Sequence, residues 1–116
     1  MKIIDSTQTR LTQITLPNAS GISAQVLIGK QDGAENFCMR QFTIAPDGYT
    51  PKHSHDWEHE IFFHAGTGEV FFRDTWHSVK AGIAVFIPGD MLHQIRNTGT
   101  KPLIFICLIP AGPPEL

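Results

Sequence analysis

The sequence predicts an all-β protein with a single domain, and three observations lead to this fold class. The chain has 116 residues, which gives room for one hydrophobic core. Hydrophobic residues make up 41% of the chain and charged residues 17%, as in an ordinary folded protein. Apolar and polar residues alternate along much of the chain, and no segment keeps a helical period. A small antiparallel sandwich or barrel over residues 1–116 is therefore expected.

Six alternating runs rich in Ile, Val and Phe are predicted to be strands. In chain order they are ISAQVLI (22–28), FCMRQFTI (37–44), EIFFH (60–64), EVFFR (69–73), IAVFI (83–87) and LIFICLI (103–109). The predicted turns are Asp32-Gly33, Pro46-Asp47-Gly48, Gly66-Thr67-Gly68, Pro88-Gly89-Asp90 and Asn97-Thr98-Gly99. A turn every eight to twelve residues or so is typical of antiparallel sandwiches and barrels.

The two ends of the chain lack this regular alternation. The N-terminal segment forms either an edge strand or an arm that reaches a second subunit. The ending AGPPEL contains two adjacent prolines, which cannot extend a sheet, so this tail is expected on the surface. Cys38 and Cys107 lie within apolar alternating runs and are interpreted as reduced core residues.

The charge pattern and the hydropathy exclude several kinds of partner. The formal net charge is -2 and the nine Lys and Arg residues are scattered, so no basic stripe is available for nucleic acid. No apolar run approaches membrane-spanning length, and the start MKIIDSTQTRLTQ lacks the apolar core of a signal peptide. We therefore expect a cytoplasmic location, with neither nucleic acid nor a membrane as partner.

The segment HSHDWEHE concentrates imidazole side chains in a short stretch of the chain. His53 and His55 share one face of an extended strand, because alternate side chains point the same way. A tight turn at Asp56-Trp57 would bring His59, which has the same parity, back toward this pair. Glu60 has the opposite parity. A divalent metal site is one explanation of this spacing, although His-x-His alone is only a moderate signal.

Further histidines lie later in the chain, at His64, His77 and His93. His93 follows the turn Pro88-Gly89-Asp90, where a strand leaving a bend can aim one side chain into the mouth of a barrel. His93 is therefore a candidate fourth ligand. His64 and His77 have no partner at ligand spacing and are interpreted as solvent-facing or hydrogen-bonded.

Two stretches resemble the two sequence motifs of the cupin superfamily. Gly48-Tyr-Thr-Pro-Lys-His53-Ser-His55, followed by Glu60 and Gly66, is similar to the first motif, which spans about 48–66 here. The segment GIAVFIPGDMLHQIRN (82–97) is similar to the second motif, although Asp90 replaces its middle glycine. This resemblance covers roughly residues 25–110. It implies a single-domain cupin jelly-roll barrel, also called a double-stranded β-helix.

The string WEHEIF resembles a smaller subgroup, the single-domain manganese cupins in which four histidines bind the metal. By that resemblance, the ligands are His53, His55, His59 and His93. The ordinary cupin set would use Glu60 in place of His59, and here Glu60 stands one residue closer than usual to the following glycine. In the four-histidine reading, Glu60 is an outer or surface carboxylate.

The cofactor expected from this pattern is one divalent transition metal per chain. The resemblance favours Mn(II), while geometry also allows Fe, Ni, Co, Cu or Zn. Four neutral imidazoles leave the ion's charge uncompensated, which favours an oxygen-bearing or anionic small molecule as ligand. Two function classes follow: a dioxygenase-like, metal-dependent oxidoreductase that activates oxygen or peroxide, or a non-catalytic small-molecule-binding cupin. Cupins also include isomerases, and the resemblance further implies a homodimer.

The walls of the expected cavity are predicted from the parity of the strands. In the run 103–109 we favour Phe105 and Cys107 as the inward-facing residues. Arg40 either points inward and binds a carboxylate, or faces solvent. Trp57 either lines the entrance or holds the turn in place.

Overall fold

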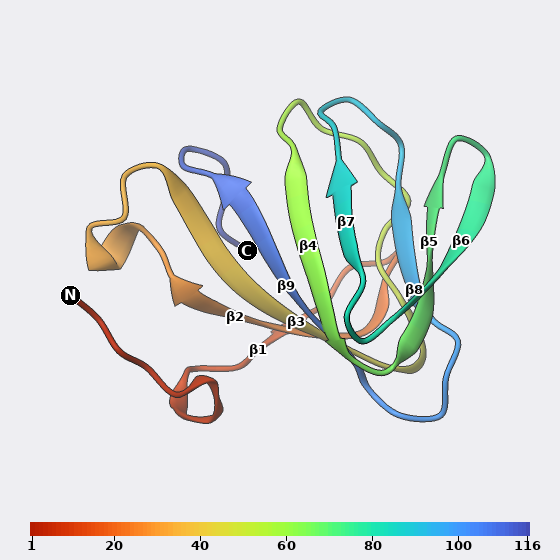
Figure 1. Ribbon diagram of the computed structural model, residues 1–116, viewed down its shortest axis with the longest axis horizontal. Helices are drawn as coiled ribbons and strands as arrows, with labels where there is room; N and C mark the ends of the chain where they lie inside the picture. Colours follow the sequence, from red (N-terminus) through yellow and green to blue (C-terminus); the bar gives the residue numbers. More distant parts are fainter.

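The computed structural model describes residues 1–116 and is built almost entirely from antiparallel strands (Figure 1). The strands are β1 (Thr12–Ile14), β2 (Ser20–Ile28), β3 (Phe37–Tyr49), β4 (His59–Ala65), β5 (Thr67–Phe72), β6 (Thr75–Lys80), β7 (Ala84–Ile87), β8 (Gln94–Asn97) and β9 (Leu103–Pro110). Two short 3-10 helices, η1 (Ser6–Gln8) and η2 (Lys30–Asp32), precede β1 and follow β2. No helix is long and apolar enough to span a membrane.

The strands form one curled sheet in the order β6-β5-β8-β3-β9-β4-β7, and β2 pairs with β3 and carries β1 at its other edge. Because of the curl, β5, β6 and β8 lie on one side of the molecule and β2, β3 and β9 on the other (Figure 1). The all-β fold class predicted from the alternating runs is thus confirmed, as a half-barrel of the jelly-roll type. This shape gives the sheet a concave inner face on which functional side chains can gather.

All six predicted strands are present, and β1 is the edge strand that was one of the two alternatives for the N-terminal segment, because it pairs only with β2. Strands β6 and β8 were not predicted, and β8 is only 4 residues long, too short to show an alternating pattern. Strand β6 is exposed along most of its length, so few of its residues are apolar. The β5–β6 hairpin turns at Arg73 and Asp74, whose φ angles of 51° and 63° are those of a two-residue turn without glycine.

The prediction of a chain reversal at Pro46-Asp47-Gly48 is wrong, because β3 continues to Tyr49. Asp47 has a φ angle of 66°, and the pairing of β2 with β3 shifts register between Ser20 and Ile22. These residues therefore form an irregularity within a long strand, of the kind that bends a strand without ending it. After Tyr49 the chain leaves the strand and enters the segment that carries the first histidine motif.

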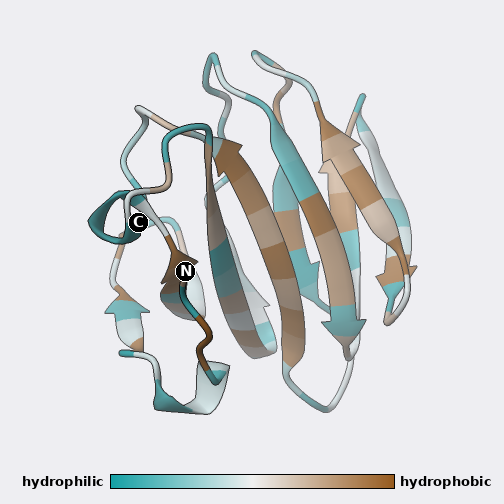
Figure 2. Ribbon diagram, turned by 60° about the vertical axis from the view of Figure 1, so that its left-hand side comes forward, coloured by the Kyte–Doolittle hydropathy of each residue, from teal (hydrophilic) through white to brown (hydrophobic).

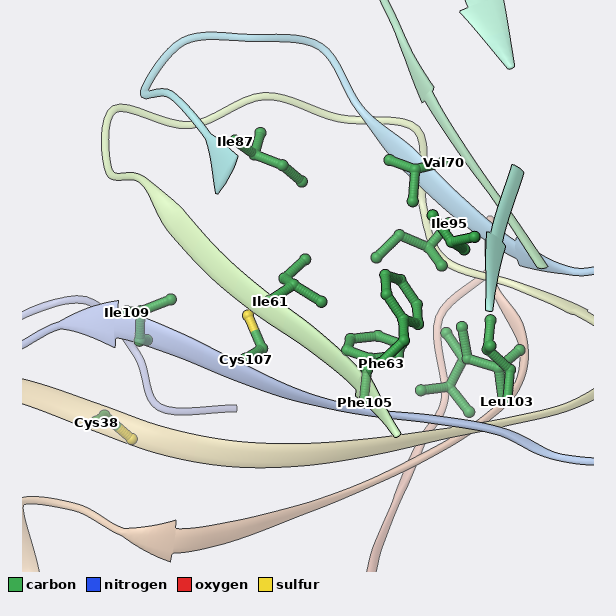
Figure 3. Close-up of a cluster of buried hydrophobic side chains, with 13 residues drawn as sticks. Cys38, Ile61, Phe63, Val70, Ile87, Ile95, Leu103, Phe105, Cys107 and Ile109 are labelled. Carbon is green, nitrogen blue, oxygen red and sulfur yellow. The ribbon is translucent and has the colours of Figure 1, made fainter. Parts of the chain in front are cut away.

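Hydrophobic bands are concentrated on the strands (Figure 2), and the buried ones meet in a single core. Phe63 and Phe105 pack with ring centroids 5.0 Å apart, close to Leu103 and Ile95 (Figure 3). Cys38 and Cys107 are buried and unpaired, as predicted. The core includes Ile22, Cys38, Ile44, Ile61, Phe63, Val70, Val79, Ile87, Ile95, Leu103, Phe105, Cys107 and Ile109.

Candidate metal centre

The two segments that carry the histidine motifs lie side by side through an isolated β-bridge between His53 and His93. The backbone N–H of His53 donates to the carbonyl of His93 at 3.1 Å, and the N–H of His93 donates to the carbonyl of His53 at 2.9 Å. The centroids of the two imidazole rings are 4.8 Å apart. Residues distant in the sequence are therefore held together by the main chain, before any metal is considered.

His53, His55 and His93 each offer one ring nitrogen, and these three nitrogens lie within 4.8 Å of one another. Nδ1 of His55 is 3.1 Å from the carbonyl oxygen of Trp57, and Nδ1 of His93 is 2.8 Å from that of Met91. A carbonyl oxygen only accepts, so Nδ1 carries the proton in both rings and Nε2 keeps its lone pair. This is the tautomer that a metal bound at Nε2 requires.

His59 joins this cluster from the start of β4, where it is 8% exposed. The bend at Asp56 and Trp57 turns the chain back as expected. Nε2 of His59 lies 2.8 Å from Nε2 of His55, so the two nitrogens face each other. Its other nitrogen, Nδ1, lies 3.2 Å from Sγ of Cys107, a weak acceptor for its proton.

The side chain of Glu60 lies outside the cluster of four histidines. Strand β4 buries His59 and exposes Glu60, because successive residues of a strand point to opposite faces. The ring centroid of His59 lies 4.5 Å from that of His55 and 5.1 Å from that of His93. The structure thus gathers the four predicted histidines and leaves the alternative ligand on the other side of the sheet.

The environment of the cluster lowers the pKa of His53, His59 and His93 and so favours their neutral forms. Burial, reinforced by the charges of His55, His93, Arg40 and His53, lowers the pKa of His59 to about 3. Burial also lowers the pKa of His93, against the opposing effect of its hydrogen bond to the Met91 carbonyl. The pKa of His53 falls to about 4, mainly by burial and then through His93 and His55.

These donors fit a divalent transition metal. The rings converge on one region, and at least two of them hold their outer proton in a hydrogen bond to a carbonyl. Imidazole nitrogen is a common ligand of divalent transition metals such as Fe, Ni, Cu and Zn, so the donor set indicates a divalent metal without selecting one.

The cluster lies in the wall of a cavity of about 250 Å³. Phe105 and Cys107 line this cavity, as the strand parity predicted, and Phe105 stacks on Phe42 with ring centroids 5.5 Å apart. Trp57 lines it too and stacks on His55 at 4.0 Å, so it borders the cavity and also supports a histidine of the cluster. Arg40 points inward, is 7% exposed and contacts both His59 and Cys107.

Part of the cavity wall was not foreseen from the sequence. Ile14 and Leu16 reach it from the end of β1 and the loop that follows, and Pro114 and Leu116 reach it from the C-terminal tail. Both tail residues are exposed, as expected of a surface tail, and they also border the cavity. Neither segment has a regular alternation, so no periodic signal could have placed them there.

The remaining two histidines lie outside the cavity. His64 is exposed, and its Nε2 lies 3.0 Å from Oε1 of Gln41. His77 is exposed and stacks on Phe72 at 4.0 Å. Both fit the prediction of solvent-facing or hydrogen-bonded residues.

The family model described as Cupin domain matches residues 40–109, a span that includes both histidine motifs. This chain belongs to the cupin superfamily. The resemblance noted in the sequence is thereby confirmed, and the curled sheet described above is the cupin fold.

Several solved structures share the fold of this cupin. The polyketide cyclase RemF from Streptomyces resistomycificus is 31% identical, with a TM-score of 0.91 over 98% of this chain and 82% of RemF. A predicted oxalate decarboxylase from Thermotoga maritima is 22% identical, with a TM-score of 0.84 over 94% of this chain and 98% of that one. At this lower identity, the likeness shows the fold alone.

A curated relative of this cupin is the protein SchB of Streptomyces halstedii. It is 32% identical over 68 residues, which are 58% of this chain and 49% of SchB. The chain thus matches about half the length of this relative.

Proposed function

We propose that this cupin is a divalent-metal-dependent cyclase that closes a ring in a carbonyl-rich small molecule of the polyketide type. The observation that carries the proposal is the position of the histidine cluster in the wall of a largely apolar cavity. Apolar walls suit a hydrocarbon-like substrate, while the polar groups are confined to one region. The likeness to RemF, a polyketide cyclase that matches 98% of the chain, supports the same class of reaction.

The proposed ligands of one metal ion per chain are His53, His55, His59 and His93, with Mn(II) favoured and Fe, Ni, Co, Cu and Zn as alternatives. When bound, the ion would act as a Lewis acid that polarises a carbonyl oxygen and makes the neighbouring C–H bonds more acidic. The apolar residues around it, such as Phe42 and Ile61, would hold the substrate in a folded conformation and exclude water.

The proposed reaction is an intramolecular aldol condensation. A methylene carbon between two carbonyls loses a proton and forms a bond to a distant carbonyl carbon, whose oxygen takes up a proton and becomes a hydroxyl. The hydroxyl then leaves with a neighbouring hydrogen as water, so the net change is ring closure with the loss of one water. No oxidant or reductant is consumed.

An oxygen- or peroxide-activating oxidoreductase is the second candidate function. It is favoured by the all-imidazole donor set, because four protein ligands would leave two positions of a six-coordinate Mn or Fe ion for other ligands. The two candidates differ in a measurable way, since only this one consumes an oxidant. A small-molecule-binding cupin without turnover and a metal-dependent isomerase are further outcomes of the test below.

The test uses metal-loaded and metal-depleted protein with a short linear poly-β-ketone, offered with and without a terminal carboxylate. The proposal expects the loaded protein to form a cyclic product that has lost one water, detected by mass spectrometry, with no oxygen uptake at an electrode. His53→Ala should abolish the product, and His77→Ala, which alters an exposed histidine outside the cavity, should not. Oxygen uptake with an oxygenated product would support the oxidoreductase, and tight binding without any product would support the binding module.

A further inference from the structure

Arg40 is a buried cation without an acidic partner. The residue is 7% exposed on β3, among the residues that line the cavity. The ion pairs in the structure join Lys2 to Asp32 and Arg96 to Glu69, and neither involves Arg40. A buried charge without a counter-ion costs free energy, because the protein interior solvates it less well than water does.

The hydrogen bonds of the Arg40 guanidinium are few and go to weak acceptors. Nη2 donates to Sγ of Cys107 at 3.0 Å and lies 3.5 Å from Nδ1 of His59. Nη1 donates to the carbonyl oxygen of Glu115 at 3.3 Å, a long distance for this kind of bond. Nε is buried and has no partner. None of these partners carries the negative charge that a guanidinium fork matches best.

We infer that Arg40 forms an anion subsite inside the cavity, which binds a carboxylate of the ligand next to the histidine cluster. The guanidinium and the cluster share this cavity, and Arg40 lies against His59. One end of a ligand would pair with Arg40, while its apolar body would lie along Phe42 and Phe105. The substrate is accordingly an apolar molecule with a free carboxylate. This assignment rests on the proposed function only in taking this cavity as the ligand site.

The C-terminal tail borders the same subsite. Glu115 offers Arg40 only its backbone carbonyl, because its carboxylate is turned away and accepts the backbone N–H of Lys30 at 2.9 Å. Pro114 and Leu116 on either side of it line the cavity. A ligand carboxylate would be a stronger acceptor for Nη1 than this carbonyl, because it carries a full negative charge and can accept two parallel N–H bonds from the guanidinium.

The test compares the binding of two probes of nearly equal shape, the aromatic carboxylate naphthoate and its neutral amide, by calorimetry at neutral pH. Metal-depleted protein is used first, so that a carboxylate bound to a metal cannot account for any preference. We expect wild type to bind naphthoate at least about tenfold more tightly than the amide, a difference of about 1.4 kcal/mol. Arg40→Met should remove this preference while retaining affinity for the amide.

Two further variants keep the result interpretable. Arg40→Lys retains the charge and loses the planar fork, so it should keep only part of the preference. Arg96→Met removes an arginine that pairs with Glu69 on the surface, and it should bind both probes as wild type does. Equal affinities in wild type, a preference that persists in Arg40→Met, or a preference seen only with metal bound would each overturn the assignment. Because no turnover is measured, these outcomes are independent of whether the protein is a cyclase.

Discussion

The backbone N–H of Asp90 donates to the carbonyl oxygen of His55 at 2.6 Å, which ties the bend of the second cupin motif to a histidine of the first. Asp90 has a φ angle of 64°, in the left-handed region that favours glycine. The cupin motif has a glycine at this position, so the structure gives the physical reason for that glycine. In this chain, an exposed aspartate adopts the same conformation.

Asp90→Gly should stabilise the protein. A left-handed conformation costs a non-glycine residue about 1 to 2 kcal/mol, part of which is offset by the greater flexibility of glycine in the unfolded chain. We therefore expect a gain in the free energy of unfolding of up to about 1 kcal/mol, measured by urea denaturation. The neighbouring change Gly89→Ala is the matched contrast, because its Cβ would lie 2.6 Å from the carbonyl oxygen of Asp56. If Asp90→Gly destabilises the protein, the aspartate has a role that the backbone does not explain.

His59→Ala and Glu60→Ala should differ strongly in metal affinity. His59 is buried and faces His55, whereas Glu60 is exposed on the opposite face of β4. Even outer partners of metal ligands typically change affinity by about 10- to 100-fold, so loss of a direct ligand should exceed about 100-fold and loss of Glu60 should stay below about tenfold. Competition with a fluorescent chelator, using Mn(II) and Zn(II), measures both variants. Retention of metal by His59→Ala together with its loss in Glu60→Ala would mean that the ordinary cupin ligand set applies.

The sequence was sufficient to predict the parts of this protein that depend on side-chain alternation. The inward positions of Phe105 and Cys107 and the opposite faces of His59 and Glu60 follow from period-two parity, which holds wherever a strand is regular. The histidine motifs could also be located, because each motif is a short stretch of sequence whose spacing can be recognised without the fold. The bridge that pairs His53 with His93 depends on the closure of the whole sheet, and no local pattern shows it.

The features that the sequence did not reveal depend on irregular backbone. Asp47 continues a strand through residues that normally form a turn, because the pairing of β2 with β3 outweighs local preference there. Pro114 and Leu116 reach the cavity through the path of the tail, which has no period to analyse. The orientation of Arg40 was open between two faces because an arginine is tolerated on either, and only the packed sheet shows it pointing inward.

We expect the protein to be a homodimer that uses the outer face of β4 and β7. Phe62 and Phe86 are 49% and 59% exposed, and the pairing of the two strands puts them on the same face of the sheet. Exposed aromatic residues that gather on one face are typical of association sites. Light scattering should give twice the mass of the chain, and Phe62→Glu with Phe86→Glu should give the monomer. A monomer mass for wild type at all concentrations would contradict this expectation.

The metal-free protein should lose stability as the pH falls below about 6.5. Burial lowers the pKa of His59 to about 3 and also lowers that of His93, whereas in the unfolded chain both titrate near 6.5. Below about pH 6.5 these histidines become protonated in the unfolded chain but stay neutral in the folded protein. The free energy of unfolding therefore decreases as the pH falls. The slope approaches about 1.4 kcal/mol per pH unit for each such proton.

Urea denaturation in the presence of a chelator, from neutral pH down to about pH 4.5, measures this slope. His59→Gln removes one titrating group and should flatten the curve, whereas His77→Gln alters an exposed histidine and should leave the slope unchanged. A slope that is the same in His59→Gln as in wild type would show that the folded protein accepts a proton at His59 in this range.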